Sequence, residues 1–197
     1  MTAPGQPDRR VATLMRSRAP SVENGTPVCV AVQRYLRNGS TDVDSSVVDA
    51  ATLAPVRYAA RVGTESECFW FRGDSAIGTV VDSDSAPSAF AEQSPHPFFL
   101  AVADLEVLAA LPLAHGYEAR FASYNPGRGF HDVHIRVEAL DTVATLGVSV
   151  AAWRVSYDAG AAPTVLWLGE TDHELIRSRS TLRTGATFWR RHEGDQG

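Results

Sequence analysis

The segment 131–134, His-Asp-Val-His, is the densest group of side chains that could transfer protons or bind a metal ion. Alternate residues of a strand share one face, so His134 and Glu138 would lie on one face and His131 on the other. The two histidines therefore cannot serve one small site, and no metal site is predicted. His134 with Glu138, or a buried His131, could carry acid–base catalysis. An exposed polar face, or a histidine satisfied in the core, explains the same residues without catalysis.

A second candidate chemistry is the binding of an amphipathic ligand. Arg177 and Arg179 share one face of a predicted strand and could hold a carboxylate or phosphate group, while aromatic side chains hold an apolar tail. The candidate ligand-binding residues are Tyr58, Trp70, Phe121, Trp153, Trp167, Arg177 and Arg179. Exposed ion pairs for the arginines and ordinary core packing for the aromatic residues are the competing explanations.

Several common chemistries are excluded by what the chain lacks. All 18 basic residues are arginine, so a Schiff-base lysine and a P-loop lysine are both excluded. There is no Cys-x-x-Cys zinc motif and no Gly-x-Ser-x-Gly nucleophile elbow. Cys29 and Cys68 are read as two half-buried thiols, and no cofactor is predicted.

Two acidic pairs could bind a hard cation such as calcium: Asp42 with Asp44, and Asp82 with Asp84. Each pair lacks the further ligands of a known calcium loop. Solubility of turns and of an edge strand is therefore the favoured interpretation of both pairs.

The composition sets the class of protein that must position these residues. The chain has 197 residues, a net charge of −5 and 44% hydrophobic residues, which suits one globular domain. An acidic chain is a poor match for the phosphate backbone, so no nucleic-acid partner is expected. No apolar run reaches the roughly 18 residues of a membrane span and no secretory signal is seen, so a soluble cytoplasmic protein is expected. The location would be periplasmic if a leader had been removed, and the oligomeric state is open.

The predicted elements are mostly strands. Residues 27–37 are rich in β-branched and aromatic residues, and Asn38-Gly39 behind them is a strong hairpin motif leading into a polar edge strand at 40–50. Residues 55–62 alternate between apolar and polar side chains, as a half-buried strand does. One apolar helix is predicted from Phe98 to the residues before Pro112.

These elements predict a mainly β fold: a single curved antiparallel sheet of about 9–11 strands, forming a barrel or half-barrel, with the apolar helix covering its concave face. An apolar cavity between sheet and helix would suit a lipophilic ligand. The predicted organisation is a flexible N-terminal tail at 1–20, a single β-barrel-like domain at 21–192 and a C-terminal tail at 193–197.

The aromatic pattern of the last third resembles that of bacterial uncharacterised half-barrel proteins related to the outer-membrane lipoprotein carrier fold, including domain-of-unknown-function relatives. The resemblance spans 27–191 in strand order and rests on the segments 150–157 (VAAWRVSY), 164–169 (TVLWLG), 174–180 (ELIRSRS) and 185–191 (GATFWRR), with Arg57-Tyr58 and 108–113 (LAALPL) upstream. It implies an open barrel with a helical lid and an apolar ligand cavity, without metal or covalent chemistry. Those relatives are usually exported, whereas this sequence shows no signal.

The leading hypothesis is a protein that holds a lipophilic or amphipathic small molecule in an apolar cavity. A small β-barrel enzyme with cyclase- or isomerase-type acid–base chemistry is the first alternative, so whether the protein is an enzyme stays open. A structural or interaction protein with a filled core is the second alternative.

Overall fold

The computed structural model describes residues 12–37, 39–82, 85–160, 162–181 and 187–191. The chain divides into two compact units. The N-terminal unit contains residues 12–104 together with Ala122–Phe130, and the C-terminal unit contains Leu105–Phe121 together with the described residues from 131 onward.

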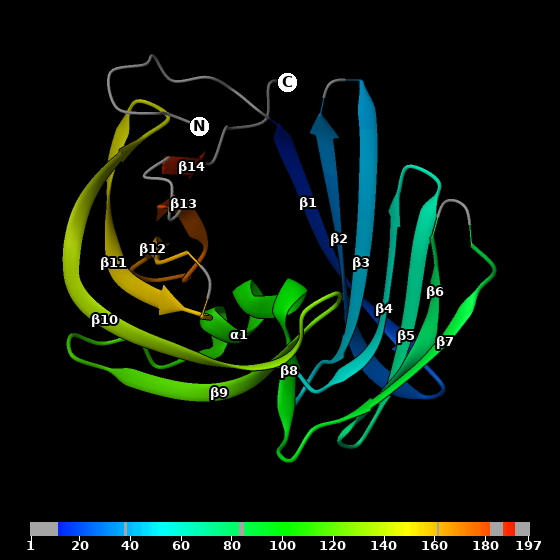
Figure 1. Cartoon of the computed structure of the whole chain (residues 1–197). Helices are drawn as coiled ribbons and strands as arrows, with labels where there is room; N and C mark the ends of the chain where they lie inside the picture. The colour runs from blue at the N-terminus through cyan, green and yellow to red at the C-terminus, as the bar shows by residue number, and fades with distance from the viewer. Residues whose placement is uncertain (1–11, 38, 83–84, 161, 182–186, 192–197) are drawn as a thin grey trace. The chain divides into compact units, whose positions relative to one another are not determined.

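The N-terminal unit is built on an antiparallel sheet whose seven strands follow one another in chain order, here called the first sheet. Its strands are β1 (Thr13–Glu23), β2 (Thr26–Arg37), β3 (Ser40–Asp49), β4 (Pro55–Val62), β5 (Glu65–Arg72), β6 (Ser75–Val81) and β7 (Ser88–Gln93). Figure 1 shows this sheet running from blue to green with a strong curl, as a half-barrel does. Tight turns join most of the strands, and Gly63 and Gly73 supply the positive φ that two of them need.

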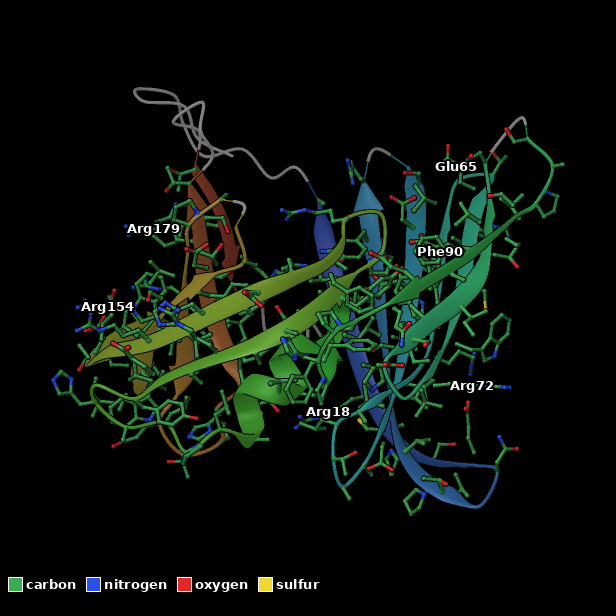
Figure 2. The ribbon with its side chains drawn as sticks, turned by 60° about the horizontal axis from the view of Figure 1, so that its bottom comes forward. Arg18, Glu65, Arg72, Phe90, Arg154 and Arg179 are labelled. Carbon is green, nitrogen blue, oxygen red and sulfur yellow. The ribbon has the colours of Figure 1, made fainter. Side chains whose placement is uncertain are left out.

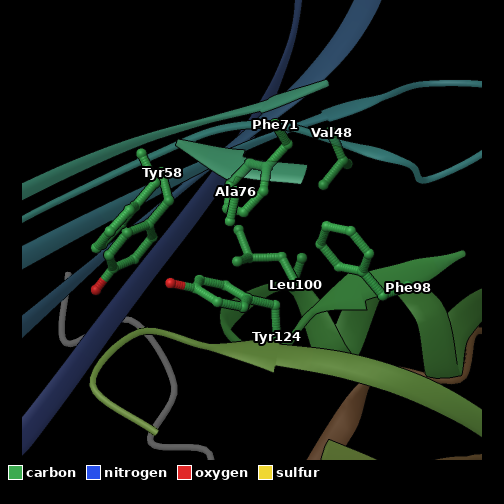
Figure 3. Close-up of a cluster of buried hydrophobic side chains, with 9 residues drawn as sticks. Val48, Tyr58, Phe71, Ala76, Phe98, Leu100 and Tyr124 are labelled. Carbon is green, nitrogen blue, oxygen red and sulfur yellow. The ribbon is translucent and has the colours of Figure 1, made fainter. Parts of the chain in front are cut away.

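The inner face of the first sheet carries the core of the N-terminal unit. Alternate side chains of its strands pack against β8 (Phe98–Leu100), the 3-10 turn Ala101–Ala103 and Tyr124. Figure 3 shows Tyr58, Phe71 and Ala76 pointing from the sheet towards Leu100, Phe98 and Tyr124. The buried members of this aromatic core are Val48, Tyr58, Phe69, Phe71, Ala76, Phe98, Leu100, Ala103 and Tyr124.

The second sheet has the strand order β14-β13-β12-β11-β10-β9-β8. After β8 the elements are α1 (Asp104–Ala110), β9 (Glu118–Asn125), β10 (Gly129–Thr145), β11 (Val148–Asp158), β12 (Thr164–Gly169), β13 (Leu175–Thr181) and β14 (Thr187–Arg191). All described pairings are antiparallel except β8 with β9, which is parallel. The tip of the β9–β10 hairpin, Ala122–Phe130, belongs to the N-terminal unit.

The core of the C-terminal unit joins α1 to the strands β10, β11 and β12. Leu108 of the helix is fully buried against Val133, Ile135 and Val137 of β10, which alternate with half-buried or exposed residues. Figure 1 shows the helix lying within the curve of these strands. The pattern of β10 is that of a strand with one buried face, so its register is fixed by that face.

The predicted fold class is confirmed as mainly β, with a curled half-barrel sheet and one short helix. The strand number was wrong: within the described ranges, fourteen strands form two sheets of seven, not one sheet of about 9–11. Strand periodicity gives the number of strands poorly and does not show where one sheet ends, because pairing depends on contacts distant in sequence.

Three local predictions also need correction. The helix is shorter than predicted, because Phe98–Leu100 forms β8; a short buried apolar run fits a strand or a helix equally well. Thr13–Glu23 is strand β1, whereas 1–20 was predicted as a tail. β3 pairs on both sides, so it is an interior strand and not an edge. The rest of the predicted tails, 1–11 and 193–197, lies outside the described residues.

Cys29 and Cys68 are both half-buried thiols, as predicted. No helix among the described residues is long and apolar enough to cross a membrane. Whether the two units act as the predicted single domain stays a prediction.

Candidate functional site

A row of polar side chains crosses the inner face of the first sheet beside the aromatic core. Cross-strand partners share a face, so the register defines this row directly. Its members, from β1 to β6, are Arg16, Gln33, Asp44, Ala60, Glu67 and Val80, and we call them the inner polar row. Tyr58 of the aromatic core lies two residues before Ala60 and therefore on the same face, so the row is next to the core.

Hydrogen bonds fix several side chains around this row. The Tyr58 hydroxyl donates to Glu67 Oε1 at 3.2 Å. The Gln33 amide donates through Nε2 to the Val102 carbonyl at 3.0 Å and accepts from the Tyr35 hydroxyl at 3.1 Å. Burial raises the pKa of Glu67, although the Tyr58 hydrogen bond works against this rise. These contacts hold Glu67 and Gln33 in defined positions.

Asp44 is a buried carboxylate of the row with one unsatisfied oxygen. Its side chain is only 9% exposed, and its Oδ1 has no hydrogen-bond partner among the described residues. Burial raises the pKa of Asp44 to about 6; the charge of Arg16 lowers it and the charge of Glu67 raises it further. A buried carboxylate that lacks a partner costs stability, and such groups concentrate at functional sites.

Replacing Asp44 with asparagine is expected to stabilise the protein at neutral pH. The pKa of Asp44 is about 6 in the folded state against its ordinary value of 3.8, so the folded state binds more protons between these values. The free energy of unfolding of the wild type therefore falls as pH rises from about 4 to about 6 and then levels off. Asp44→Asn removes this loss, so it should gain about 2 kcal/mol relative to the wild type at neutral pH.

Urea unfolding at about pH 4.5 and about pH 7.5 measures this effect. Asp44→Asn should differ more from the wild type at the higher pH, and Asp132→Asn, an exposed change of the same kind, is the comparison variant. A pH-independent effect of Asp44→Asn would contradict the role assigned to its burial.

Apolar side chains with accessible surface lie within the row and next to it on the same face. Ala60, Val80 and Phe90 pack against the aromatic core but are only partly buried. Ala60 and Val80 flank Glu67 in the row, while Phe90 is on β7, where Figure 2 labels it. The inner face therefore offers carboxylates and accessible apolar surface side by side.

The C-terminal unit holds most of the predicted aromatic and arginine residues in a different arrangement. The Trp167 indole is buried and donates through Nε1 to Asp141 Oδ2 at 3.0 Å. The Arg177 guanidinium lies 4.2 Å from the centre of the Trp167 ring, and that of Arg179 lies 5.7 Å from the Trp189 ring. The two arginines are thus placed over indole rings, where cation–π attraction holds them. Their predicted role in binding an anion stays a prediction.

Each member of the predicted acid–base couple has another partner in the structure. His134 Nε2 lies 3.8 Å from Glu118 Oε2, whereas Glu138 accepts a hydrogen bond from Arg154 Nε at 3.0 Å. These side chains are each between 38% and 50% exposed. His131 is half-buried on the opposite face of β10, as the alternation predicted. Within the described residues, no three His, Cys, Asp or Glu side chains are grouped so that they could hold a metal ion.

The other predicted ligand-binding residues are divided between the two units. Tyr58 is in the N-terminal core, whereas Phe121 and Trp153 pack against the C-terminal core. Trp70 is 49% exposed on the outer face of the first sheet, opposite the similarly exposed Ile77. Figure 2 shows Arg179 and Arg154 on the second sheet.

Sequence reasoning named Asp44 only as half of an acidic pair and missed Glu67 and Gln33. Asp44 was interpreted as a solubilising edge residue, and its burial overturns that interpretation. The period of two was the usable signal, since Asp44 lies four residues before the buried Val48 on the same face of β3. Asp42 lies on the same face, and its Oδ2 is 4.0 Å from a guanidinium nitrogen of Arg37. Asp84 lies outside the described residues.

Fold and site together define a mainly β half-barrel protein whose curled sheet carries a partly buried polar row on its inner face. The chain belongs to the family described as protein of unknown function (DUF3108), whose model matches residues 11–188. No curated protein and no solved structure matches the chain.

Proposed function

We propose that this chain is a binding protein that holds a lipophilic or amphipathic small molecule against the inner face of the first sheet. The observation that carries the proposal is the partly accessible apolar surface of Ala60, Val80 and Phe90 beside Asp44 and Glu67. Ligand sites are typically apolar surfaces with a few fixed polar groups that set orientation.

The packed aromatic core supports a site that lies on the sheet and not inside the core. Tyr124 and Phe69 are almost completely buried, and their rings meet edge to face with their centres 5.9 Å apart. Such a core provides a rigid base, while the half-buried residues around it provide the contact surface. Tyr58 would link the two, because its ring packs on Phe69 and its hydroxyl reaches Glu67.

A neutral apolar dye, N-phenyl-1-naphthylamine, tests the proposal by its fluorescence increase on binding. Val80→Asp puts a charge on the inner face of β6 and should lower dye affinity by about ten-fold or more. Ile77→Asp is the matched control, because it makes the same kind of change on the outer face of the same strand, where Ile77 is 47% exposed. Its affinity should stay within about two-fold of the wild type.

Circular dichroism and thermal unfolding establish that both variants are folded, and the milder pair Val80→Ser and Ile77→Ser repeats the comparison. A wild type that does not bind the dye would contradict the proposal and favour the filled-core interaction protein. If Ile77→Asp lowers affinity and Val80→Asp does not, the ligand lies on the outer face, beside Trp70. Native mass spectrometry of the purified protein then asks whether a small molecule copurifies.

The finer expectations remain part of this proposal. A relationship to the outer-membrane lipoprotein carrier fold rests on the aromatic strand pattern of the sequence and stays a prediction. Bacterial origin, a cytoplasmic location and an enclosed apolar cavity remain predictions, and cell fractionation would test the location.

A further inference from the structure

We infer that the ligand of the inner face carries a cationic head, of the alkylammonium class, which Asp44 and Glu67 receive together. This inference rests on the proposed function, because it names the ligand chemistry of that same site. It reverses the polarity expected from the arginines, which would hold an acidic head.

The two carboxylates are placed to share one cation. Asp44 is on β3 and Glu67 on β5, with β4 between them. Neighbouring strands are about 4.8 Å apart, so their backbones are separated by about 10 Å at this level. Ala60 is the only residue of the row between them, and its side chain is a single methyl group. An ammonium group above Ala60 would be within reach of both side chains.

Asp44 has unused capacity to accept hydrogen bonds. Its Oδ1 is buried and, within the described part of the chain, accepts no hydrogen bond, although the residue is about nine-tenths buried. Burying a carboxylate oxygen without a partner is costly, and a cation that supplies N–H donors would remove this cost. Glu67 already accepts a hydrogen bond from Tyr58 at Oε1, which fixes its carboxylate on the other side of Ala60.

The charge of the face also favours a cation. Glu65 and Glu67 of β5 and Asp42 and Asp44 of β3 all lie on it by alternation, and of these Asp42 is ion-paired with Arg37 of β2. Arg16 lies in the same row and its charge acts on Asp44, but a single guanidinium does not neutralise both Asp44 and Glu67. An anionic head at this position would face two carboxylates, which costs binding energy. The tail would extend over Val80 and Phe90.

Competition for the N-phenyl-1-naphthylamine site tests the inference with three probes of equal chain length: decylamine, decanol and decanoate, each below its aggregation concentration. Decylamine should displace the dye at a concentration about ten-fold lower than decanol, and decanoate should be the weakest. Asp44→Asn and Glu67→Gln should each remove most of the preference for the amine while decanol displaces the dye as before. Asp132→Asn, an exposed change on β10, should keep the preference.

The outcomes separate the two claims. If the dye binds and decanol displaces it, but the amine has no advantage or decanoate is strongest, the cation inference is wrong and the binding proposal stands. An amine preference that survives both Asp44→Asn and Glu67→Gln also overturns the inference. If neither the dye nor any probe binds, the binding proposal fails, and the inference fails with it.

Discussion

Replacing Tyr124 with alanine is expected to lower the free energy of unfolding by about 4 kcal/mol. Tyr124 is 1% exposed, and its ring centre lies 5.6 Å from that of Phe71 and 4.9 Å from that of Phe130. Phe69, Phe90 and Phe98 surround the same ring. Removing it leaves a cavity among rigid aromatic rings, which cannot collapse easily.

Urea unfolding of the N-terminal unit within the intact chain measures this loss, and Tyr124→Phe is the control. Phenylalanine keeps the ring and its edge-to-face contacts, so it should cost less than about 1.5 kcal/mol. Equal losses for the two variants would show that the hydroxyl, and not the ring, stabilises this core.

Replacing Gly78 with alanine should cost about 3 kcal/mol, the second-largest effect. A Cβ atom at Gly78 would overlap backbone atoms of the neighbouring strand: the Cys68 carbonyl oxygen and, at 2.9 Å, Phe69 Cα. The Phe69 ring also lies over this position, with Cδ1 at 2.6 Å. Because two of these atoms belong to backbone, β5 and β6 would have to separate.

Gly147→Ala is the comparison variant for thermal and urea unfolding. A Cβ atom there meets nothing within 4 Å, but the φ of +79° is unfavourable for alanine. That variant should therefore lose only about 1 kcal/mol, from backbone strain alone. A loss at Gly78 no larger than the loss at Gly147 would mean that the two strands can adjust to a side chain between them.

The sequence predicted the elements better than it predicted their assembly. Alternation in 55–62 and 131–137 identified β4 and the buried face of β10, because a strand with one buried face must repeat every two residues. Strands β2 and β3 pair as the predicted hairpin requires, with Arg37 opposite Ser40, while Asn38 lies outside the described residues. The division into two sheets was not predicted, since no local pattern reports which strands lie at a sheet boundary.

The candidate site was harder to predict for a related reason. Asp44 and Glu67 are 23 positions apart in the numbering, and only the registers of β3, β4 and β5 bring them into one row. Trp167 and Arg177 were both selected as candidates, and the structure stacks them on each other. Residue types identified side chains that could carry chemistry, whereas the register of the strands decides which of these side chains lie close together.

The N-terminal unit is made of two separate segments of the chain, and this has a consequence for folding during synthesis. This unit takes Ala122–Phe130 from beyond a segment, Leu105–Phe121, that belongs to the C-terminal unit. Tyr124 and Phe130 are therefore translated after all seven strands of the first sheet, although both pack in its aromatic core. Domains usually fold as they emerge from the ribosome, but this unit is complete only after its last segment, Ala122–Phe130, has been translated. Until then the nascent sheet exposes Phe69 and Phe71, a period in which chaperone binding would be most useful.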